Sequence, residues 1–589
     1  MRIAKIILFL LKKFSLRRNL EILSVILILV VLSFSELFGL LVVKETISSI
    51  TSDTNSNYAF FNMLNKIFPN QYSNLERNVI LLIFFTLNTL FLRTFSIWYS
   101  LRIVAKADND IATLIYQNVI YQPYKFHLER NSSEVVSLLT VDSLRVGDTV
   151  RNILQIATSI FISFGVVIGL LLVNWKLSIL SFLLVFSFYA LFNFKVKKTL
   201  KIAGKFITDA WDIQIRLISE SIGNIRNVLL DNNQIFYSKI FKKLNRKLRD
   251  KSSKVIFLTV IPRYLIESIG IVALSIYLFI LSRQGVTLEN TISYIGVIAY
   301  GSQKLIPSIN NIYSSYSDIY YAQASLEKVL KTLYFPDKEE IEKDVNLKAK
   351  KELEFEKIEF KNLYFNFGKN QKNILDNIDL TICRGEKIGI IGSTGSGKST
   401  FIDIIMGLLK PSEGEIIING KNLYGNSEEE FIYEWRSIIS HVPQSIFITD
   451  NSIEENIALG TNRNSIDQRL LVESSKIAEI YDFIVNTKHK FRTQVGERGS
   501  RLSGGQKQRI GIARAIYKKP KILIFDEATS ALDSHTENKI INNISKLSTN
   551  TTLIMIAHRT STLRFCDQIY QIKNNKLISR GTPEKTFDL

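Results

Sequence analysis

The sequence predicts an all-α domain of six membrane-spanning helices, followed by a soluble α/β domain. The chain has 589 residues, whereas a single hydrophobic core stops growing at roughly 250 to 300 residues. Six apolar stretches in the first half approach the roughly 20 residues that a helix needs to cross a bilayer. From Leu353 onward, short β-rich runs alternate with helical patterns, as in a domain with a mainly parallel sheet.

The composition agrees with a chain that lies partly in lipid. Hydrophobic residues make up 46% and charged residues 22%, and the mean hydropathy is +0.12, which excludes a disordered chain. The formal net charge of +20 could suggest nucleic acid, but residues 1–330 carry +16 of it and residues 331–589 only +4. The excess cations belong to the apolar part, as in membrane proteins with basic cytoplasmic loops, so we expect no nucleic-acid partner. Two cysteines, Cys383 and Cys566, exclude a disulfide framework.

The spacing of the apolar stretches indicates how they are connected. The third and fourth are separated by little more than Asn174 and Trp175, which predicts a tight hairpin. The connections 100–151 and 198–254 are long, charged and mostly free of Gly and Pro, so we expect helices that continue well beyond the bilayer. The six predicted spans are 21–43, 78–99, 152–173, 176–197, 255–281 and 288–308.

Basic residues near the ends of the spans indicate the orientation. Six Lys and Arg residues precede the first span, whereas the connection 44–77 contains only Lys44, Lys66 and Arg77. Because basic residues collect on the cytoplasmic side, we expect the amino terminus, both long connections and the soluble domain there. The chain is therefore expected to be a multi-pass protein of the cell inner (plasma) membrane, with membrane lipid as a partner.

The remaining segments complete the expected domain organisation. Residues 1–20 combine apolar and basic positions, which predicts an amphipathic interfacial helix; a signal peptide is less well supported because no small-residue cleavage site follows. A second amphipathic stretch, 58–68, could be a short external helix or an ordinary loop helix. The expected domains are the interfacial helix (1–20), a transmembrane domain (21–330), a mixed-charge linker (331–352) and an α/β domain (353–589).

The clearest chemical motif lies between an apolar strand, 387–391, and a helical pattern that begins at Thr400. Glycines in this loop let backbone N–H groups converge on phosphate oxygens, Lys398 supplies a cation for the β and γ phosphates, and Ser399 offers a hydroxyl to Mg²⁺. Strand, loop and helix occur in the required order, so a nucleotide site is predicted, with ATP and Mg²⁺ as cofactors. The expected ATP-binding residues here are Gly392, Ser393, Thr394, Gly395, Ser396, Gly397, Lys398, Ser399 and Thr400.

A second motif is the apolar run 522–525 followed by Asp526 and Glu527. Asp526 is expected to reach Mg²⁺, usually through water, and Glu527 to polarise the water that attacks the γ-phosphate. An acidic pair at a strand end is common by itself. Beside a phosphate loop, it indicates ATP hydrolysis.

Between these motifs, Leu502-Ser503-Gly504-Gly505-Gln506 opens a helical pattern, 507–517. This run resembles the signature of ATP-binding cassette (ABC) proteins. In that family the signature of one subunit closes over the γ-phosphate held by the other, which implies ATP-binding roles for Ser503, Gly505 and Gln506, assisted by the helix dipole. One chain would then hold two half-sites and no complete site.

Further positions match the family's motifs residue by residue. The resemblance implies that Phe367 stacks on adenine, where the family more often has Tyr; a core Phe is the alternative. Gln444 matches the loop glutamine that senses Mg²⁺, His558 matches the switch histidine that contacts the γ-phosphate, and Asp533 lies in the matching D-loop. The implied catalytic residues are Glu527, His558 and Gln444, and the implied metal ligands are Ser399, Gln444 and Asp526.

Six spans followed by one cassette is the order of a half-transporter exporter, and the resemblance covers essentially the full chain. It implies the type I (type IV) ABC exporter fold and an ATPase coupled to transmembrane transport. Because Glu527, Gln506 and His558 are all present, a homodimer with two competent sites is the simpler expectation, and a channel that ATP merely gates is disfavoured. The resemblance also implies coupling helices near 122–127 and 223–229.

Apart from the lysines at the two ends of 176–197, three cations lie within the predicted spans: Arg93, Arg263 and Lys304. Ionisable residues at bilayer depth are expensive and often face a polar cavity. One interpretation is a cationic belt, doubled to six charges in a dimer, that binds an anionic, amphipathic cargo. The alternative is structural: Arg263 pairs with Glu267 four residues later, and Lys304 reaches the interface from near a helix end.

The segments 262–270 and 304–310 resemble the fifth and sixth spans of bacterial flippases for polyprenyl-pyrophosphate-linked oligosaccharides. Those proteins carry arginines at positions that match Arg93 and Arg263, whereas Lys304 keeps the charge and loses the bidentate fork. The resemblance implies a flippase that moves a lipid-linked oligosaccharide from the cytoplasmic to the outer leaflet. An exporter of a lipid A-like lipid, a peptide or a drug stays open, because the cassette does not specify the cargo.

Overall fold

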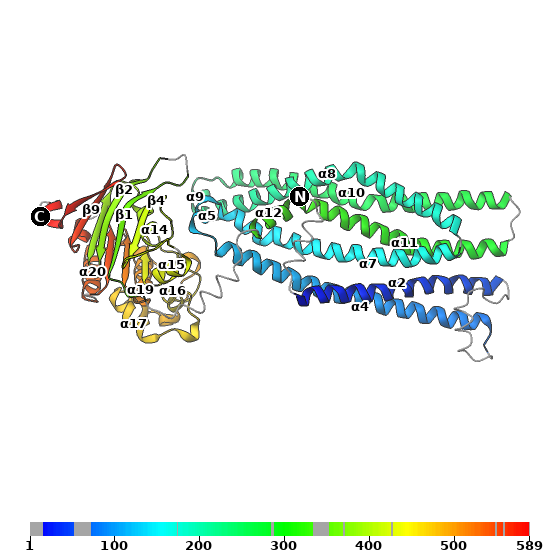
Figure 1. The fold of residues 1–589 in the computed structure, drawn as a ribbon, viewed down its shortest axis with the longest axis horizontal. Coiled ribbons are helices and arrows are strands. Elements are labelled where there is room, and N and C mark those ends of the chain that lie inside the picture. The colour runs from blue at the N-terminus through cyan, green and yellow to red at the C-terminus, as the bar shows by residue number, and fades with distance from the viewer. Residues whose placement is uncertain are drawn as a thin grey trace. The chain divides into compact units, whose positions relative to one another are not determined.

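The computed structural model divides the chain into two compact units, residues 1–122 with 127–336 and residues 337–589 with 123–126 (Figure 1). The predicted stretch 58–68 and His558 lie outside the described residues, as do most of 1–20 and of the linker 331–352. The described residues are 16–51, 72–173, 175–283, 288–333, 353–368, 372–425, 428–529, 531–547, 550–557 and 560–587.

Long helices build the first unit. The described helices between residues 16 and 333 are α2 (Leu16–Thr51), α4 (Asn74–Ile120), α5 (Tyr124–Glu129), α6 (Ser132–Ser137), a π-helical turn (Leu138–Asp142), α7 (Ser143–Val173), α8 (Trp175–Gly223), α9 (Ile225–Leu230), α10 (Gln234–Arg283), α11 (Leu288–Tyr321) and α12 (Gln323–Leu333). Each predicted span lies within one long helix, in the order α2, α4, α7, α8, α10 and α11. The six-residue helices α5 and α9 occupy the two places where coupling helices are expected.

The long helices extend beyond a bilayer, as the charged connections predict. Helices α4, α8 and α10 have 47, 49 and 50 residues, or about 70 to 75 Å at 1.5 Å per residue, whereas a hydrocarbon core is about 30 Å thick. Among the described residues, four helical stretches are long and apolar enough to cross a membrane: Leu20–Ile50, Asn74–Ile120, Ser132–Val173 and Gln234–Ala273. The other two predicted spans, on α8 and α11, include side chains that are not described.

Several buried clusters hold the helices together, and two of them join three or more long helices. Helices α2, α4, α7 and α11 share a buried core that includes Leu29, Ile103, Val166 and Val297. Helices α8, α10 and α11 meet through Tyr189, Ile266 and Tyr313. Close approach is also required between α2 and α7, because a Cβ on Gly165 would lie 2.3 Å from the carbonyl oxygen of Ser33. A larger residue at position 165 would force these helices apart.

The second unit contains strands and shorter helices. The strands are β1 (Lys357–Phe365), β2 (Leu375–Cys383), β3 (Lys387–Gly392), β4 (Glu413–Ile418), β5 (Lys421–Asn422), β6 (Ile439–Val442), β7 (Ile522–Asp526), β8 (Thr552–Ile556), β9 (Gln568–Lys573) and β10 (Lys576–Gly581). The described α-helices are α14 (Lys398–Ile405), α15 (Glu428–Ser437), α16 (Ile453–Ile457), α17 (Gln468–Ile477), α18 (Tyr481–Val485), α19 (Gly504–Tyr517), α20 (Ser534–Leu547), α21 (Thr560–Leu563) and α22 (Pro583–Phe587). The predicted α/β architecture is confirmed.

The strands form two sheets with different pairing. The four-stranded sheet has the order β2-β1-β4-β5, and its neighbours are antiparallel. The six-stranded sheet has the order β10-β9-β3-β8-β7-β6, and the run from β9 to β6 is parallel. Because parallel strands point the same way, the loops that follow β3, β6, β7 and β8 emerge at one edge of this sheet.

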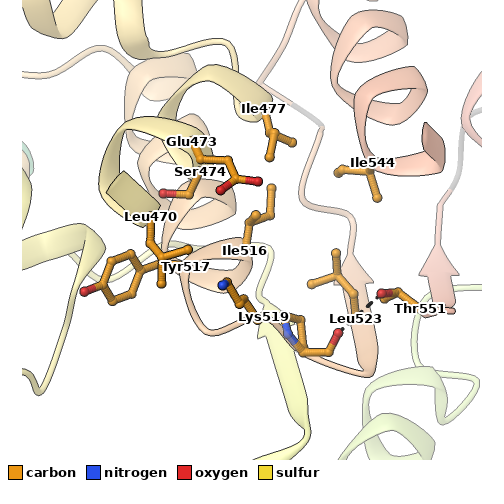
Figure 2. A pocket seen from close by; sticks show the side chains of 11 residues that line it. Leu470, Glu473, Ser474, Ile477, Ile516, Tyr517, Lys519, Leu523, Ile544 and Thr551 are labelled. Carbon is orange, nitrogen blue, oxygen red and sulfur yellow. Dashed lines mark hydrogen bonds between the residues drawn. The ribbon is translucent and has the colours of Figure 1, made fainter. Parts of the chain in front are cut away.

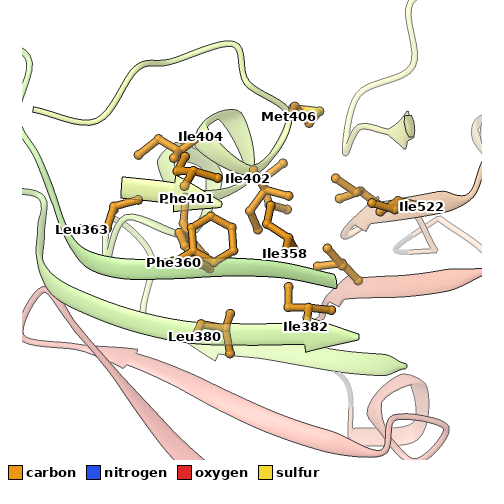
Figure 3. Close-up of a cluster of buried hydrophobic side chains, with 14 of the residues drawn as sticks. Ile358, Phe360, Leu363, Leu380, Ile382, Phe401, Ile402, Ile404, Met406 and Ile522 are labelled. Carbon is orange, nitrogen blue, oxygen red and sulfur yellow. The ribbon is translucent and has the colours of Figure 1, made fainter. Parts of the chain in front are cut away.

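A buried hydrophobic cluster joins the antiparallel sheet to α14 (Figure 3). The rings of Phe360 on β1 and Phe401 on α14 have centroids 5.4 Å apart. Trp435 is fully buried, and its indole N–H donates to the carbonyl oxygen of Ile405 over 2.7 Å. These contacts fix the helix that follows the phosphate loop, and so they position the loop itself.

Candidate functional site

The sheet topology places most of the predicted site residues at one edge. Gly392 ends β3, Gln444 follows β6 by two residues, and Glu527 follows β7 directly. The registers agree, because Asp526 on β7 and Ile390 on β3 both pair with Ile556, the last residue of β8. The chain then leaves β8 toward His558, which is not described. Three sequence motifs that lie far apart in the chain, at the ends of β3, β6 and β7, therefore converge.

The phosphate loop has the conformation that a phosphate cradle needs. Gly395 and Gly397 have φ values of +80° and +100°, which residues other than glycine rarely adopt. Lys398 begins α14 and is 92% buried, and its ammonium group donates to the carbonyl oxygens of Gly392 (2.8 Å) and Ser393 (3.0 Å). The lysine charge and the positive end of α14 thus lie beside the same loop, an arrangement that attracts phosphate.

Glu527 is held by its backbone as well as by its side chain. Its φ of +49° lies in the left-handed region, where a non-glycine residue is strained by about 1 to 3 kcal/mol. Its N–H donates to the carbonyl oxygen of Ile556 (3.0 Å), and its Oε2 accepts a hydrogen bond from Nε2 of Gln444 (2.7 Å). The strained backbone and this contact aim the Glu527 carboxylate at the edge of the sheet.

Negative charge is concentrated beside Lys398. Burial, and then the charge of Glu527, raise the pKa of Asp526, while Lys398 opposes the rise. Burial also raises the pKa of Asp403 on α14 to about 6, with a further contribution from Asp526. Sequence reasoning missed Asp403, although a single carboxylate among the apolar residues of 398–405 was the available signal. A bound cation would relieve the repulsion among these carboxyl groups.

The signature opens α19 with a capping box. The Oγ of Ser503 accepts from the N–H of Gln506 (3.3 Å), and Oε1 of Gln506 accepts from the N–H of Ser503 (2.8 Å). Both side chains are therefore engaged within their own chain. The first N–H groups of a helix have no partner inside it, so the start of α19, with Gly504 and Gly505, can receive an anion.

The D-loop packs against this helix. The N–H of Ala531 donates to Oε1 of Gln508 over 3.0 Å, and a Cβ on Gly505 would lie 3.3 Å from the carbonyl oxygen of Ala531. Gln508 was not recognised in the sequence, where it is one polar residue among many on the helix. Asp533 accepts from the N–H and the hydroxyl of Thr536, and the first of these bonds is the main reason that its pKa is lowered. In this chain Asp533 caps α20.

Phe367 lies at the margin of the core just after β1. Its half-buried ring meets the ring of Phe365 edge to face, with centroids 5.1 Å apart. This contact fits a core role and leaves part of the ring exposed. Stacking on adenine stays a prediction.

The three cations of the predicted spans have different surroundings. Lys304 lies midway along α11 and pairs with Glu36 of α2 over 3.2 Å, and the Glu36 side chain is only 1% exposed. Arg263 pairs with Glu267 through Nε over 2.8 Å. Arg93, half-buried on α4, has no ion pair among the described residues. Two of the three cations thus have an acidic partner within the chain, and a cationic belt around a cargo cavity stays a prediction.

Two cavities of the second unit can be compared with the predicted site. One, of about 540 Å³, lies between the loop of Gln444 and the start of α19, and Gly504, Gln508 and Ala531 line it. The other, of about 270 Å³, is shown in Figure 2 and lies where β7 and β8 begin, at the opposite edge of the sheet from Glu527. None of the predicted site residues lines the second cavity.

Comparison with known proteins finds matches over both units. The model of the ABC transporter domain matches residues 375–530, and the model of the ABC transporter transmembrane region matches residues 22–302. The chain is 30% identical over 557 residues to ABC transporter B family member 6 of Dictyostelium discoideum, covering 89% of this chain and 79% of that protein. It is 29% identical to a putative export ATP-binding/permease protein of Rickettsia typhi, covering 82% of each.

A solved structure shares the fold over nearly the whole chain. It is a bacterial Atm1-family ABC exporter with ATP bound, which superposes with a TM-score of 0.77 and covers 96% of both chains. The sequence identity is 21%, so this likeness concerns the arrangement of helices and strands.

Proposed function

Because the chain belongs to the ABC transporter family, we propose that it is a homodimeric flippase for an oligosaccharide linked to a polyprenyl pyrophosphate. The chain is a membrane-spanning, ATP-driven exporter, and its nucleotide-binding domain is an ATPase coupled to transport. The proposed direction is from the cytoplasmic to the outer leaflet of the inner (plasma) membrane, with the amino terminus and the nucleotide-binding domain in the cytoplasm.

The proposed catalytic arrangement uses the loops at the edge of the parallel sheet. Backbone N–H groups of the phosphate loop would hold the β and γ phosphates, and Lys398 would turn to them from the carbonyls of Gly392 and Ser393. Glu527 would polarise the attacking water while Gln444 holds its carboxylate in place. His558 is proposed to contact the γ-phosphate.

Ser399, Gln444 and Asp526 fit a magnesium ion, because hydroxyl, amide and carboxylate oxygens are suitable ligands for a hard cation. When bound, magnesium would neutralise charge on the phosphate oxygens. Within the described part of the chain, no three carboxylate, imidazole or thiol groups gather into a metal-binding cluster. A metal site that is shared with nucleotide phosphates accounts for this sparse set of ligands.

The signature supports a dimer of identical chains. Ser503 and Gln506 close their capping box within one chain and leave the helix start for the phosphate held by a second copy. The same chain also carries Glu527 and Gln444 in contact, so both sites of a homodimer would be competent. ATP would draw the two nucleotide-binding domains together, with α5 and α9 proposed as coupling helices, and hydrolysis would reset them.

The surroundings of Arg263 are the observation that supports the proposed cargo. The Arg263 side chain is 46% exposed within a predicted span. An ionised group at bilayer depth costs free energy, so such a residue often has a functional role. Glu267 accepts a hydrogen bond only from Nε, and neither terminal nitrogen donates a hydrogen bond to another described residue. Those two nitrogens can bind a pyrophosphate in a bidentate manner. Arg93, on another helix, would add a second cation.

The proposal is tested by reconstituting the full-length protein in lipid vesicles with a polyprenyl-pyrophosphate-linked oligosaccharide. We expect this lipid to stimulate the ATPase and to be translocated, and we expect Arg263→Ala to remove most of the stimulation while basal ATPase persists. Arg246→Ala is a matched control, because Arg246 faces Asp250 four residues later on the same helix, outside the spans. Undiminished translocation by Arg263→Ala would contradict the assigned cargo.

A second candidate follows from the ion pairs. Glu267 balances the charge of Arg263, and Glu36 balances that of Lys304, which leaves a less cationic interior than a pyrophosphate carrier needs. The same engine would then export a lipid A-like lipid, a peptide or a drug. Stimulation of the ATPase by one of these compounds, without stimulation by the lipid-linked oligosaccharide, would select this candidate.

A further inference from the structure

A dense basic surface lies where the apolar part of α8 ends and that of α10 begins. We call it the basic collar and define it as Lys195, Lys197, Lys198, Lys201, Lys251 and Lys254, all of which are exposed. Between residues 195 and 205, α8 carries no acidic residue. Between residues 239 and 254, the only acidic residue of α10 is Asp250, which lies 4.0 Å from Arg246.

The two helices bring these lysines to one level. Val196 and Leu200 of α8 share a buried cluster with Val255 of α10, and Tyr321, the last residue of α11, packs against it. The lysines flank these buried residues in the sequence, so both rows lie at the same height on the helix pair. This height is the end of the apolar stretches, on the side where the chain leaves α11 toward the nucleotide-binding domain.

Exposed apolar side chains lie directly beside the collar. Phe194 is 87% exposed, Ile256 62%, Phe257 60% and Ile202 59%. Apolar side chains next to a belt of lysines match the boundary between acyl chains and lipid headgroups. A surface that faced only water would not be expected to expose so many large apolar groups at this level.

The collar charges are not balanced within the described protein. Lys195, Lys198, Lys201, Lys251 and Lys254 form no ion pair with any described residue. Other cations of the same unit do have partners: Lys106 pairs with Glu21 over 2.9 Å, and Lys328 pairs with Asp142 (3.0 Å) and Asp212 (2.8 Å). Lys197 differs again, because its ammonium group lies 4.7 Å from the centre of the Tyr320 ring.

We propose that the basic collar binds the phosphate groups of anionic phospholipids in the leaflet that is proposed to be cytoplasmic. The apolar neighbours would enter the acyl region while the lysines contact the headgroups, which would hold the hairpin of α8 and α10 at a fixed depth. This inference does not depend on the identity of the cargo. It concerns resident lipid, and it requires only that α8 and α10 cross the membrane.

The test measures phospholipid bound to the purified full-length dimer by native mass spectrometry, with added phosphatidylglycerol or phosphatidylcholine and no cargo. The collar variant combines Lys195→Gln, Lys198→Gln, Lys201→Gln and Lys254→Gln. The control variant removes four charges from the distal part of α10, as Lys239→Gln, Lys242→Gln, Lys243→Gln and Lys247→Gln. Basal ATPase activity, which no collar residue serves, reports that each variant is folded.

We expect native protein and the control variant to retain phosphatidylglycerol in preference to phosphatidylcholine. The collar variant should retain at least about tenfold less phosphatidylglycerol than native protein. Replacing the same four collar lysines with arginine should leave the retention of phosphatidylglycerol unchanged. Equal loss in both glutamine variants would show unspecific attraction, and equal retention of the two lipids would show no headgroup recognition. Either result would overturn the proposal, as would a collar variant that dissociates into single chains, because the collar would then be a subunit interface.

Discussion

Nε2 of Gln444 donates a hydrogen bond of 2.7 Å to Oε2 of Glu527. The two residues are 83 positions apart, and they meet because β6 and β7 are parallel neighbours whose loops leave the same edge of the sheet. Glu527 has a left-handed backbone, so its carboxylate is aimed by φ as well as by this contact. The pair joins the residue proposed to polarise water to a residue proposed as a magnesium ligand.

Replacing Gln444 should therefore weaken catalysis without abolishing nucleotide binding. In Gln444→Ala the Glu527 carboxylate loses its partner, and we expect the ATPase rate to fall roughly tenfold. The magnesium concentration for half-maximal rate should also rise. Gln444→Glu should be worse than Gln444→Ala, because it would place a second negative charge against Glu527. A fall in rate with no change in magnesium dependence would contradict the proposed metal contact.

The Glu36–Lys304 pair is expected to stabilise the helix packing. Glu36 is almost fully buried on α2, so Glu36→Gln leaves the Lys304 charge without its partner, and the cost of breaking a buried pair is about 3 to 5 kcal/mol. The single variants Glu36→Gln and Lys304→Met should each lower the melting temperature of the detergent-purified protein. The double variant Glu36→Leu with Lys304→Met should recover most of the loss.

The same pair distinguishes packing from cargo binding. If Lys304 binds cargo instead, Lys304→Met would keep its melting temperature and lose stimulation of the ATPase by cargo. A melting temperature unchanged in both single variants would contradict the structural role. A double-mutant cycle measures the coupling between the two side chains directly.

His441 should make the protein less stable in acid. It lies on β6, its Nε2 is buried without a hydrogen-bond partner among the described residues, and burial lowers its pKa. An unfolded histidine takes up a proton near pH 6.5, whereas the buried imidazole resists protonation. Stability from this group is therefore present above that pH and is lost as the pH falls below it.

His441→Gln replaces the imidazole with a side chain that does not titrate. The melting temperature of the variant should fall less between pH 7 and pH 5 than that of the native protein. His535→Gln serves as the control, because His535 lies on the exposed first turn of α20. An identical pH dependence in the native protein and in His441→Gln would contradict the account.

Local patterns explain why much of this site could be predicted from sequence. The phosphate loop, the acidic strand end and the signature that begins at Leu502 each depend on residues within a short stretch, so they can be recognised without the fold. The six spans could be predicted for the same reason, since hydropathy is a property of each helix alone.

Other features depend on packing between distant segments. Glu36 and Lys304 lie far apart in the sequence, and no pattern in 21–43 indicates which helix faces Glu36. Asp403 acquires its raised pKa from burial and from Asp526, which belongs to another strand. Both effects arise only when helices or strands are placed beside each other, so neither could be predicted from the sequence.

The most direct test of the central claim compares magnesium-dependent ATPase activity of the native protein and of Glu527→Gln in lipid vesicles. We predict clear hydrolysis by the native protein, a decrease of at least about 100-fold in the variant, and ATP binding retained by the variant. Glu413→Gln, on the exposed start of β4, is the matched control and should hydrolyse ATP at the native rate. Undiminished hydrolysis by Glu527→Gln would contradict the proposed site and with it the proposed mechanism of transport.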